Sequence, residues 1–373
     1  MATHDVPRAT RPRTEEERQQ ELDKIDKYRS LEDQFRLQVA STQPGPETLQ
    51  LTTKLLRLNP EYYTVWNARR RCLLSGALFK PSNAASTPVP LANTGSASSP
   101  AESSPTSPSE SLKTSALPGH GPASETHDDE SRDDQARDVI RAELDFIVPL
   151  LMQHPKCYWI WNYRTWILQQ AIEKLQVPVA KAIWEEELAL VGKMLHRDSR
   201  NFHAWAYRRH VVSQLESPAL EGQSMVDAEF EYTTKMIHKD LSNFSAWHNR
   251  SQLVCRLLDE RSSSDAARRE FLDQEFELVL RGLDVGPEDQ SLWYYHQFLV
   301  SNVTGHGDRP TIAPNLATSE REAIIRREID AIKELLEDYD DIKWIYEVLV
   351  ELRGLDPMRN GRWDDLAKGL GLA

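Results

Sequence analysis

The feature that most constrains the fold is a tryptophan that recurs in five similar segments. From the second copy onward the tryptophans are 44, 42 and 46 residues apart, and 95 residues separate the first two. The segments are 59–73, 154–168, 198–212, 240–254 and 286–300, with tryptophans Trp66, Trp161, Trp205, Trp247 and Trp293. Self-similarity at such a period indicates a repeat protein with one supersecondary unit per copy. Trp344 marks a degenerate sixth copy.

The residues around each tryptophan follow a helical pattern. An aromatic residue stands three positions before it in four copies, a basic residue three positions after it, and an aliphatic residue seven after it. These are Tyr63, Tyr158, Phe202 and Phe244; Arg69, Arg164, Arg208, Arg250 and His296; and Leu73, Leu168, Val212, Val254 and Val300. Such offsets share one helix face, whereas a strand would alternate with period two. We therefore expect a buried stripe in which tryptophan anchors the core and arginine bonds neighbouring backbone carbonyls.

Second amphipathic stretches lie between these segments, for example at 181–196, 225–239 and 269–283. Each unit then reads as a helical hairpin, which cannot bury its apolar stripe alone but can do so by stacking. The predicted fold is all-α: a right-handed α-α superhelix, a crescent-shaped solenoid of hairpins with an extended concave surface. A tetratricopeptide array would repeat at about 34 residues and fits poorly.

We expect one solenoid domain that is interrupted once. Residues 1–80 hold the N-terminal helices and the first repeat, and 139–373 hold the remaining hairpins and the C-terminal helices. Between them, 81–138 is predicted to be a disordered Ser/Pro-rich insertion, since 81–130 contains 12 Ser, 8 Pro and no aromatic residue. Such a composition cannot bury enough apolar surface to offset its ordering entropy. The insertion is either a plain spacer or a site of regulatory phosphorylation.

Composition limits the partners and the compartment. A formal net charge of −13 over 373 residues argues against nucleic acid and anionic lipid as partners. Cys72, Cys157 and Cys255 are odd in number and far apart, which is typical of reduced thiols in a cytoplasmic protein. The sequence shows neither a secretory signal nor a membrane-spanning apolar run.

The Trp-x-x-Arg hairpin at this spacing resembles the repeat of protein prenyltransferase α subunits. The resemblance covers 15–80 and 139–370, and LDPMRNGRWDDL (355–366) is similar to the segment that closes the family's chains. It implies an α crescent that wraps an α/α-barrel β subunit, and that the zinc ion and the isoprenoid pocket belong to that β subunit. No metal-ligand spacing or phosphate loop appears in this chain, so we expect it to bind no cofactor alone and to be inactive by itself.

Three segments resemble the type II member of the family, the α subunit of Rab geranylgeranyltransferase, in its short fungal form. They are EDQSLWYYH (288–296), RNFHAW with Phe202, and RTEEERQQELDKIDKYRSLED (13–33). The resemblance implies transfer of geranylgeranyl from its diphosphate to C-terminal cysteines of Rab GTPases, with a Rab escort protein as a further partner. Two alternatives stay open: the α subunit shared by farnesyltransferase and geranylgeranyltransferase type I, and a non-enzymatic helical-repeat adaptor.

The resemblance also implies residues near the departing diphosphate, where cations and hydrogen-bond donors would stabilise developing charge. By motif position these are Lys156 and Tyr158 in HPKCYWIW, and Asn201 and His203 in RNFHAW. Lys156, Tyr158 and His203 are the candidate catalytic groups, and Asn201 adds a candidate binding group.

Each candidate also has a plainer interpretation. Lys156 is then a solvated surface charge, His203 a hydrogen-bonded turn residue, and Asn201, like Asn243, a helix N-cap. His4 lies near the N-terminus and could reach the partner's metal. Trp159 and Trp166 make their helix apolar on more than one side, which predicts burial against neighbouring helices and a partner subunit.

Overall fold

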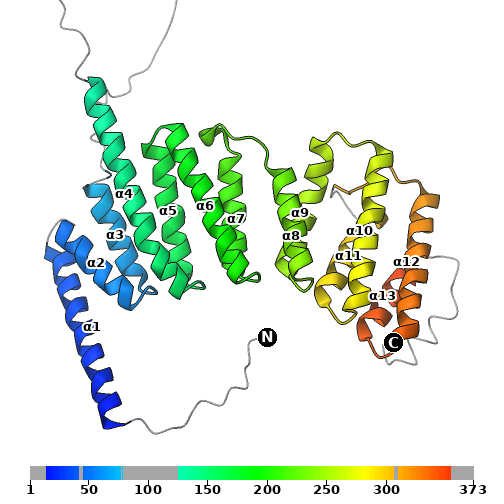
Figure 1. Ribbon diagram of the computed structural model, residues 1–373, viewed down its shortest axis with the longest axis horizontal. Coiled ribbons are helices and arrows are strands. Elements are labelled where there is room, and N and C mark those ends of the chain that lie inside the picture. Colours follow the sequence, from blue (N-terminus) through cyan, green and yellow to red (C-terminus); the bar gives the residue numbers. More distant parts are fainter. Residues whose placement is uncertain (1–13, 42–44, 77, 79–124, 306–309, 354–373) are drawn as a thin grey trace, which may run out of the picture. The chain divides into compact units, whose positions relative to one another are not determined.

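The computed structural model describes residues 14–41, 45–76, 78, 125–305 and 310–353 (Figure 1). Within these ranges the chain forms thirteen α-helices and one short 3-10 helix. They are α1 (Glu15–Ser41), α2 (Pro46–Leu58), α3 (Tyr63–Ser75), α4 (Glu125–Gln153), α5 (Tyr158–Lys174), α6 (Val177–Arg197), α7 (Phe202–Leu215), η1 (Pro218–Leu220), α8 (Val226–Lys239), α9 (Phe244–Glu260), α10 (Asp265–Val285), α11 (Gln290–Thr304), α12 (Thr318–Asp338) and α13 (Lys343–Arg353). None of these helices is both long and apolar enough to cross a membrane.

The helices pair as hairpins within two compact units, Met1–Gln176 and Val177–Ala373. In the first unit α2 packs on α3 and α4 on α5, with α1 against α2; in the second, α6 packs on α7, α8 on α9, α10 on α11 and α12 on α13. The all-α hairpin prediction is confirmed. The handedness, the crescent shape and the single continuous solenoid stay predictions. Below, the helix that carries the repeated tryptophan is called the Trp helix (α3, α5, α7, α9, α11), and its predecessor the leading helix (α2, α4, α6, α8, α10).

All five repeated tryptophans are buried, at most 5% exposed, as predicted. Each indole N–H donates to the carbonyl oxygen six residues upstream, in the turn that joins the leading helix to the Trp helix. The acceptors are the carbonyls of Pro60, Pro155, Ser199, Leu241 and Pro287, at 2.7–2.9 Å. One side chain therefore fills the core, satisfies its own buried donor and closes the turn of its hairpin.

The repeated arginine forms buried ion pairs with glutamates. The guanidinium groups of Arg69, Arg208 and Arg250 each bond both carboxylate oxygens of a glutamate on the next leading helix. The partners are Glu143, Glu229 and Glu275. Backbone carbonyls, which the sequence predicted as the acceptors, are a smaller part of the contacts: Arg164 donates to the Leu144 carbonyl and Arg69 to that of Leu49. Each bidentate pair joins one hairpin to the next.

The fifth copy replaces this arginine with histidine. His296 Nε2 lies 3.2 Å from Glu328 Oε2, and neither side chain is exposed to solvent. The pairing of a Trp helix with the following helix is thus kept, with a smaller partner and one contact in place of two.

One end of the predicted insertion differs from the helix boundary in the structure. The insertion was expected to run from 81 to 138, but α4 already begins at Glu125. Ala136, Ile140, Leu144, Ile147 and Leu151 are buried at helical spacing, so apolar packing stabilises this helix from Ala136 onward. Residues 81–124 lie outside the described residues, so disorder there stays a prediction. The C-terminal segment 355–366 and His4 also lie outside them.

The sixth copy is shifted by two residues from its expected register, so that Tyr346 takes the position of the repeated tryptophan. Trp344 is half-buried and meets Tyr294 edge-on, whereas Ile345 is fully buried. The Tyr346 hydroxyl donates to the Asp340 carbonyl, six residues upstream, and so closes the turn as the indoles do in the other copies.

Candidate functional site

The aromatic residues three positions before the tryptophans are exposed, contrary to the predicted buried stripe. Tyr63, Tyr158, Phe202 and Phe244 are 50–66% exposed, and each is the first residue of its Trp helix. On a helical wheel this position lies about 60° from the tryptophan, on the side opposite the arginine. Because the arginine side packs on the next leading helix, the aromatic side stays open. Each hairpin therefore presents an exposed ring at one end of its Trp helix.

Lys156 and Tyr158 lie where α4 turns into α5. The turn is held by the Trp161 indole on the Pro155 carbonyl and by Cys157, whose backbone N–H donates to the His154 carbonyl. The Cys157 thiol lies 3.6 Å from the Pro60 carbonyl, which ties this turn to the preceding hairpin. Lys156 is exposed and Tyr158 is half-exposed, so both groups extend from a fixed stretch of backbone.

Trp159 and Trp166 pack against neighbouring side chains, as predicted, and both stay partly exposed. Their burial against a partner subunit stays a prediction. Trp159 stacks on Tyr63 with 5.1 Å between ring centroids, and Tyr158 meets it edge-on at 5.2 Å. Trp166 lies 5.4 Å from Tyr163 and beneath the guanidinium of Arg70. The two additional indoles thus fill the groove between α3 and α5.

Asn201 and His203 lie in the second unit, whereas Lys156 and Tyr158 lie in the first. The Asn201 side chain is 2% exposed and accepts hydrogen bonds from the backbone N–H groups of His203 and Ala204. Asn243 caps α9 in the same way. The N-cap interpretation is confirmed for both residues. His203 is half-buried, with its ring 4.0 Å from that of Phe202. The proposed roles of all four residues toward a diphosphate stay predictions.

Cys157 gives a prediction about the environment of this turn. Burial raises the pKa of its thiol to about 11. At pH 8 the native thiol should therefore react with iodoacetamide on the order of 100-fold more slowly than in the urea-unfolded chain, because the thiolate is the nucleophile. Raising the pH toward the native pKa should restore reactivity. Mass spectrometry of Cys157 peptides measures both rates, and equal labelling of native and unfolded chains would refute this.

Sequence reasoning missed a second cation, four residues after the tryptophan. Arg70 donates to Asn162 Oδ1 at 2.7 Å, and Arg209 occupies the same repeat position in α7. Desolvation by neighbouring groups lowers the pKa of both guanidinium groups. Among the described residues, no carboxylate pairs with either one. The arginine doublets after Trp66 and Trp205 were the signal available in the sequence.

The described part of the chain holds no group of three or more His, Cys, Asp or Glu side chains placed to bind a metal ion. Its titratable clusters are ion pairs such as Arg256 with Glu216 and Glu260, where hydrogen bonds to these carboxylates raise the pKa of Arg256. These pairs lie at the protein surface, and we assign them no chemical role.

Comparison with known proteins identifies the repeat. The protein prenyltransferase alpha subunit repeat matches the chain in five stretches, each with one of the five tryptophans: 46–76, 140–171, 184–215, 226–257 and 272–303. The five-copy prediction is confirmed.

Whole-protein comparisons extend the similarity beyond the repeats. A geranylgeranyl transferase type-2 subunit alpha of Schizosaccharomyces pombe is 30% identical over 340 residues, covering 90% of this chain and 81% of the relative. The Candida albicans protein of the same name is 29% identical over 303 residues, or 75% and 67% of the two chains. The human one is 26% identical over 254 residues, 33% of its length. A solved structure, the Candida albicans protein geranylgeranyltransferase-I complexed with GGPP, aligns over 92% of this chain and 88% of its own, with 16% identity and a TM-score of 0.48.

Proposed function

This chain belongs to the protein prenyltransferase alpha subunit family, and we propose that it is the α subunit of a type II geranylgeranyltransferase that acts only when paired with a β subunit. The observation that carries the proposal is the 30% identity to the Schizosaccharomyces pombe type-2 α subunit across 81% of that protein. The proposed reaction transfers geranylgeranyl from its diphosphate to C-terminal cysteines of Rab GTPases presented by an escort protein, in the cytoplasm. The zinc ion is proposed to belong to the β subunit.

The reaction breaks the bond between the first carbon of the isoprenoid and a diphosphate oxygen, and forms a carbon–sulfur bond with the acceptor cysteine. Negative charge grows on the departing diphosphate, so fixed cations and donors beside it lower the barrier. We propose that Lys156 supplies a positive charge there, and that Tyr158 and His203 donate hydrogen bonds. Asn201, whose side-chain oxygen caps α7, would act by fixing the backbone that carries His203.

Two observations support Lys156 and Tyr158 as the central pair. Both are exposed, as groups that meet a ligand held by another subunit must be. Both also extend from a turn whose backbone is held by Trp161 and Cys157, so the backbone that carries them is already ordered before binding.

The test is co-expression with each class of prenyltransferase β subunit. We expect the chain to co-elute with a type II β subunit in gel filtration, and the pair to transfer geranylgeranyl to a Rab protein in the presence of escort protein. Stable pairing with a farnesyltransferase or type I β subunit instead would assign the chain to the shared α subunit. A chain that pairs with no β subunit would be an adaptor, and the proposal would be wrong.

A further inference from the structure

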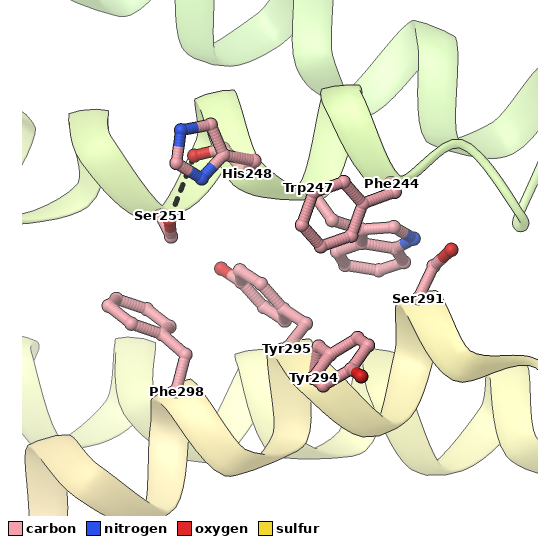
Figure 2. Close-up of a pocket in the computed structure, with 8 residues that line it drawn as sticks. All are labelled: Phe244, Trp247, His248, Ser251, Ser291, Tyr294, Tyr295 and Phe298. Carbon is pink, nitrogen blue, oxygen red and sulfur yellow. Dashed lines mark hydrogen bonds between the residues drawn. The ribbon is translucent and has the colours of Figure 1, made fainter. Parts of the chain in front are cut away.

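An open aromatic groove lies between α9 and α11 in the second unit (Figure 2). Trp247 and Tyr295 form its floor with 4.7 Å between ring centroids, while Phe244 and Tyr294 stand at its rim, each about half-exposed. Ser251 and Ser291 line it from the two helices. Its volume is about 250 Å³. Small-molecule sites usually span about 300–1,000 Å³, so this groove suits a single side chain better than a whole ligand.

The groove between α3 and α5 in the first unit shows what fills such a space. The eight repeat positions that line the α9–α11 groove correspond there to residues that include Tyr63, Arg70, Trp159 and Trp166. In that groove Trp159 stacks on Tyr63, and Arg70 lies over Trp166. In the α9–α11 groove Ser291 stands in place of Trp159, and Ser251 in place of Arg70. The groove is open because the chain does not supply an indole of its own.

Charge is distributed unequally around the open groove. In the second unit the Trp helices α7, α9 and α11 contain two acidic residues, Asp259 and Glu260 at the end of α9. Helices α6, α8, α10 and α12 together contain nineteen acidic residues. Arg209 acts electrostatically on His248, a lining residue of the groove, and no carboxylate among the described residues neutralises it. A partner that meets this face would therefore gain from carrying carboxylates.

We propose that the α9–α11 groove receives an aromatic side chain of the β subunit, flanked by carboxylates that pair with Arg209. This inference rests on the proposed function, because it takes the β subunit as the partner. The inserted ring would enter between α9 and α11 and contact the exposed rings of Phe244 and Tyr294, which meet edge-on with 6.1 Å between centroids. The contact of Trp159 with Tyr63 in the first unit is the model for it. Buried aromatic anchors of this kind carry most of the binding energy of an interface.

The test uses the purified heterodimer and measures subunit exchange between tagged and untagged copies. Ser251→Trp places an indole in the groove from a half-buried position on α9, and Tyr294→Ala removes part of its rim. We expect either change to raise the dissociation rate at least about 10-fold, because affinity differences between related complexes appear mainly in dissociation. The control Gln274→Trp puts the same indole on the exposed side of α10 and should leave the exchange rate unchanged.

The charge part of the proposal has its own measurement. Arg209→Glu should slow association several-fold at low ionic strength, and the difference should shrink as salt is added. An association rate that does not depend on this substitution would refute the role of carboxylates.

The outcomes separate the two proposals. A wild-type chain that pairs with no β subunit overturns the proposed function and this inference together. A wild-type heterodimer whose exchange is unaffected by both groove variants, each with native circular dichroism, overturns the inference alone. The inference alone is also overturned if a groove variant changes only the KM for the isoprenoid diphosphate, or changes only self-association of the α chain.

Discussion

Replacement of Arg250 by alanine is expected to lower the free energy of unfolding by about 3–5 kcal/mol, because it leaves the buried Glu275 carboxylate with the Tyr295 hydroxyl but no cation. Arg250 bonds both oxygens of Glu275, donates to Thr234 at 2.8 Å, and lies over the ring of Phe230. Glu275 is 4% exposed, so water cannot replace the lost guanidinium without opening the contact between the two hairpins. Urea denaturation followed by circular dichroism measures the change.

A matched control distinguishes a buried ion pair from an ordinary one. Arg261 and Asp227 also lie in the second unit, with side chains 52% and 62% exposed. Arg261→Ala should cost about 0–1 kcal/mol. The double variant Arg250→Met with Glu275→Leu should recover most of the stability that Arg250→Ala loses, since it removes both charges. If Arg250→Ala proves as mild as Arg261→Ala, the ion pair does not hold the hairpins together.

Lys156→Ala in the heterodimer should slow single-turnover geranylgeranyl transfer by roughly 10- to 1000-fold, which is the effect of removing one group that stabilises transition-state charge. Assembly should be unaffected, because Trp161 and Cys157 hold the turn in the variant as well. Rapid-quench measurement at saturating isoprenoid diphosphate isolates the chemical step from product release.

Two further variants sharpen this test. Lys156→Arg keeps the charge but changes its geometry, and it should retain more activity than the alanine variant. Lys193→Ala removes an exposed lysine from α6 and should leave the rate unchanged. A single-turnover rate for Lys156→Ala equal to that of the wild type would return Lys156 to the status of a solvated surface charge.

The hairpin repeat could be predicted from sequence because the tryptophan performs the same tasks in each of the first five copies. It fills the core and closes its own turn through the indole N–H, so it tolerates no change of register. The glutamate partners were predictable too, but only after the leading helices are aligned. Glu143, Glu187, Glu229 and Glu275 each stand 18 residues before a tryptophan. A lone glutamate on an apolar helix face carries no such signal.

The exposure of individual side chains and the open groove could not be predicted, because they depend on how neighbouring helices pack. The spacing of Tyr63 and Phe244 relative to the tryptophans is helical whether their rings are buried or exposed, so the sequence could not show that they are half-exposed. The groove at Ser291 could not be predicted either, because a serine in place of a tryptophan at this position does not alter the helical hydrophobic pattern. Trp159 was noticed as unusual, but its contact with Tyr63 depends on how neighbouring hairpins pack.

The buried ion pairs also bear on how such a chain could grow or shrink. A copy that carries glutamate 18 residues before its tryptophan and arginine three residues after it is complementary to another copy of itself. Internal hairpins are therefore interchangeable building blocks. The first and fifth copies are not: the first has Thr48 at the glutamate position, and the fifth has His296 at the arginine position. Gene duplication could thus lengthen the array from within by whole hairpins, and each new junction would find its charge partner already in place.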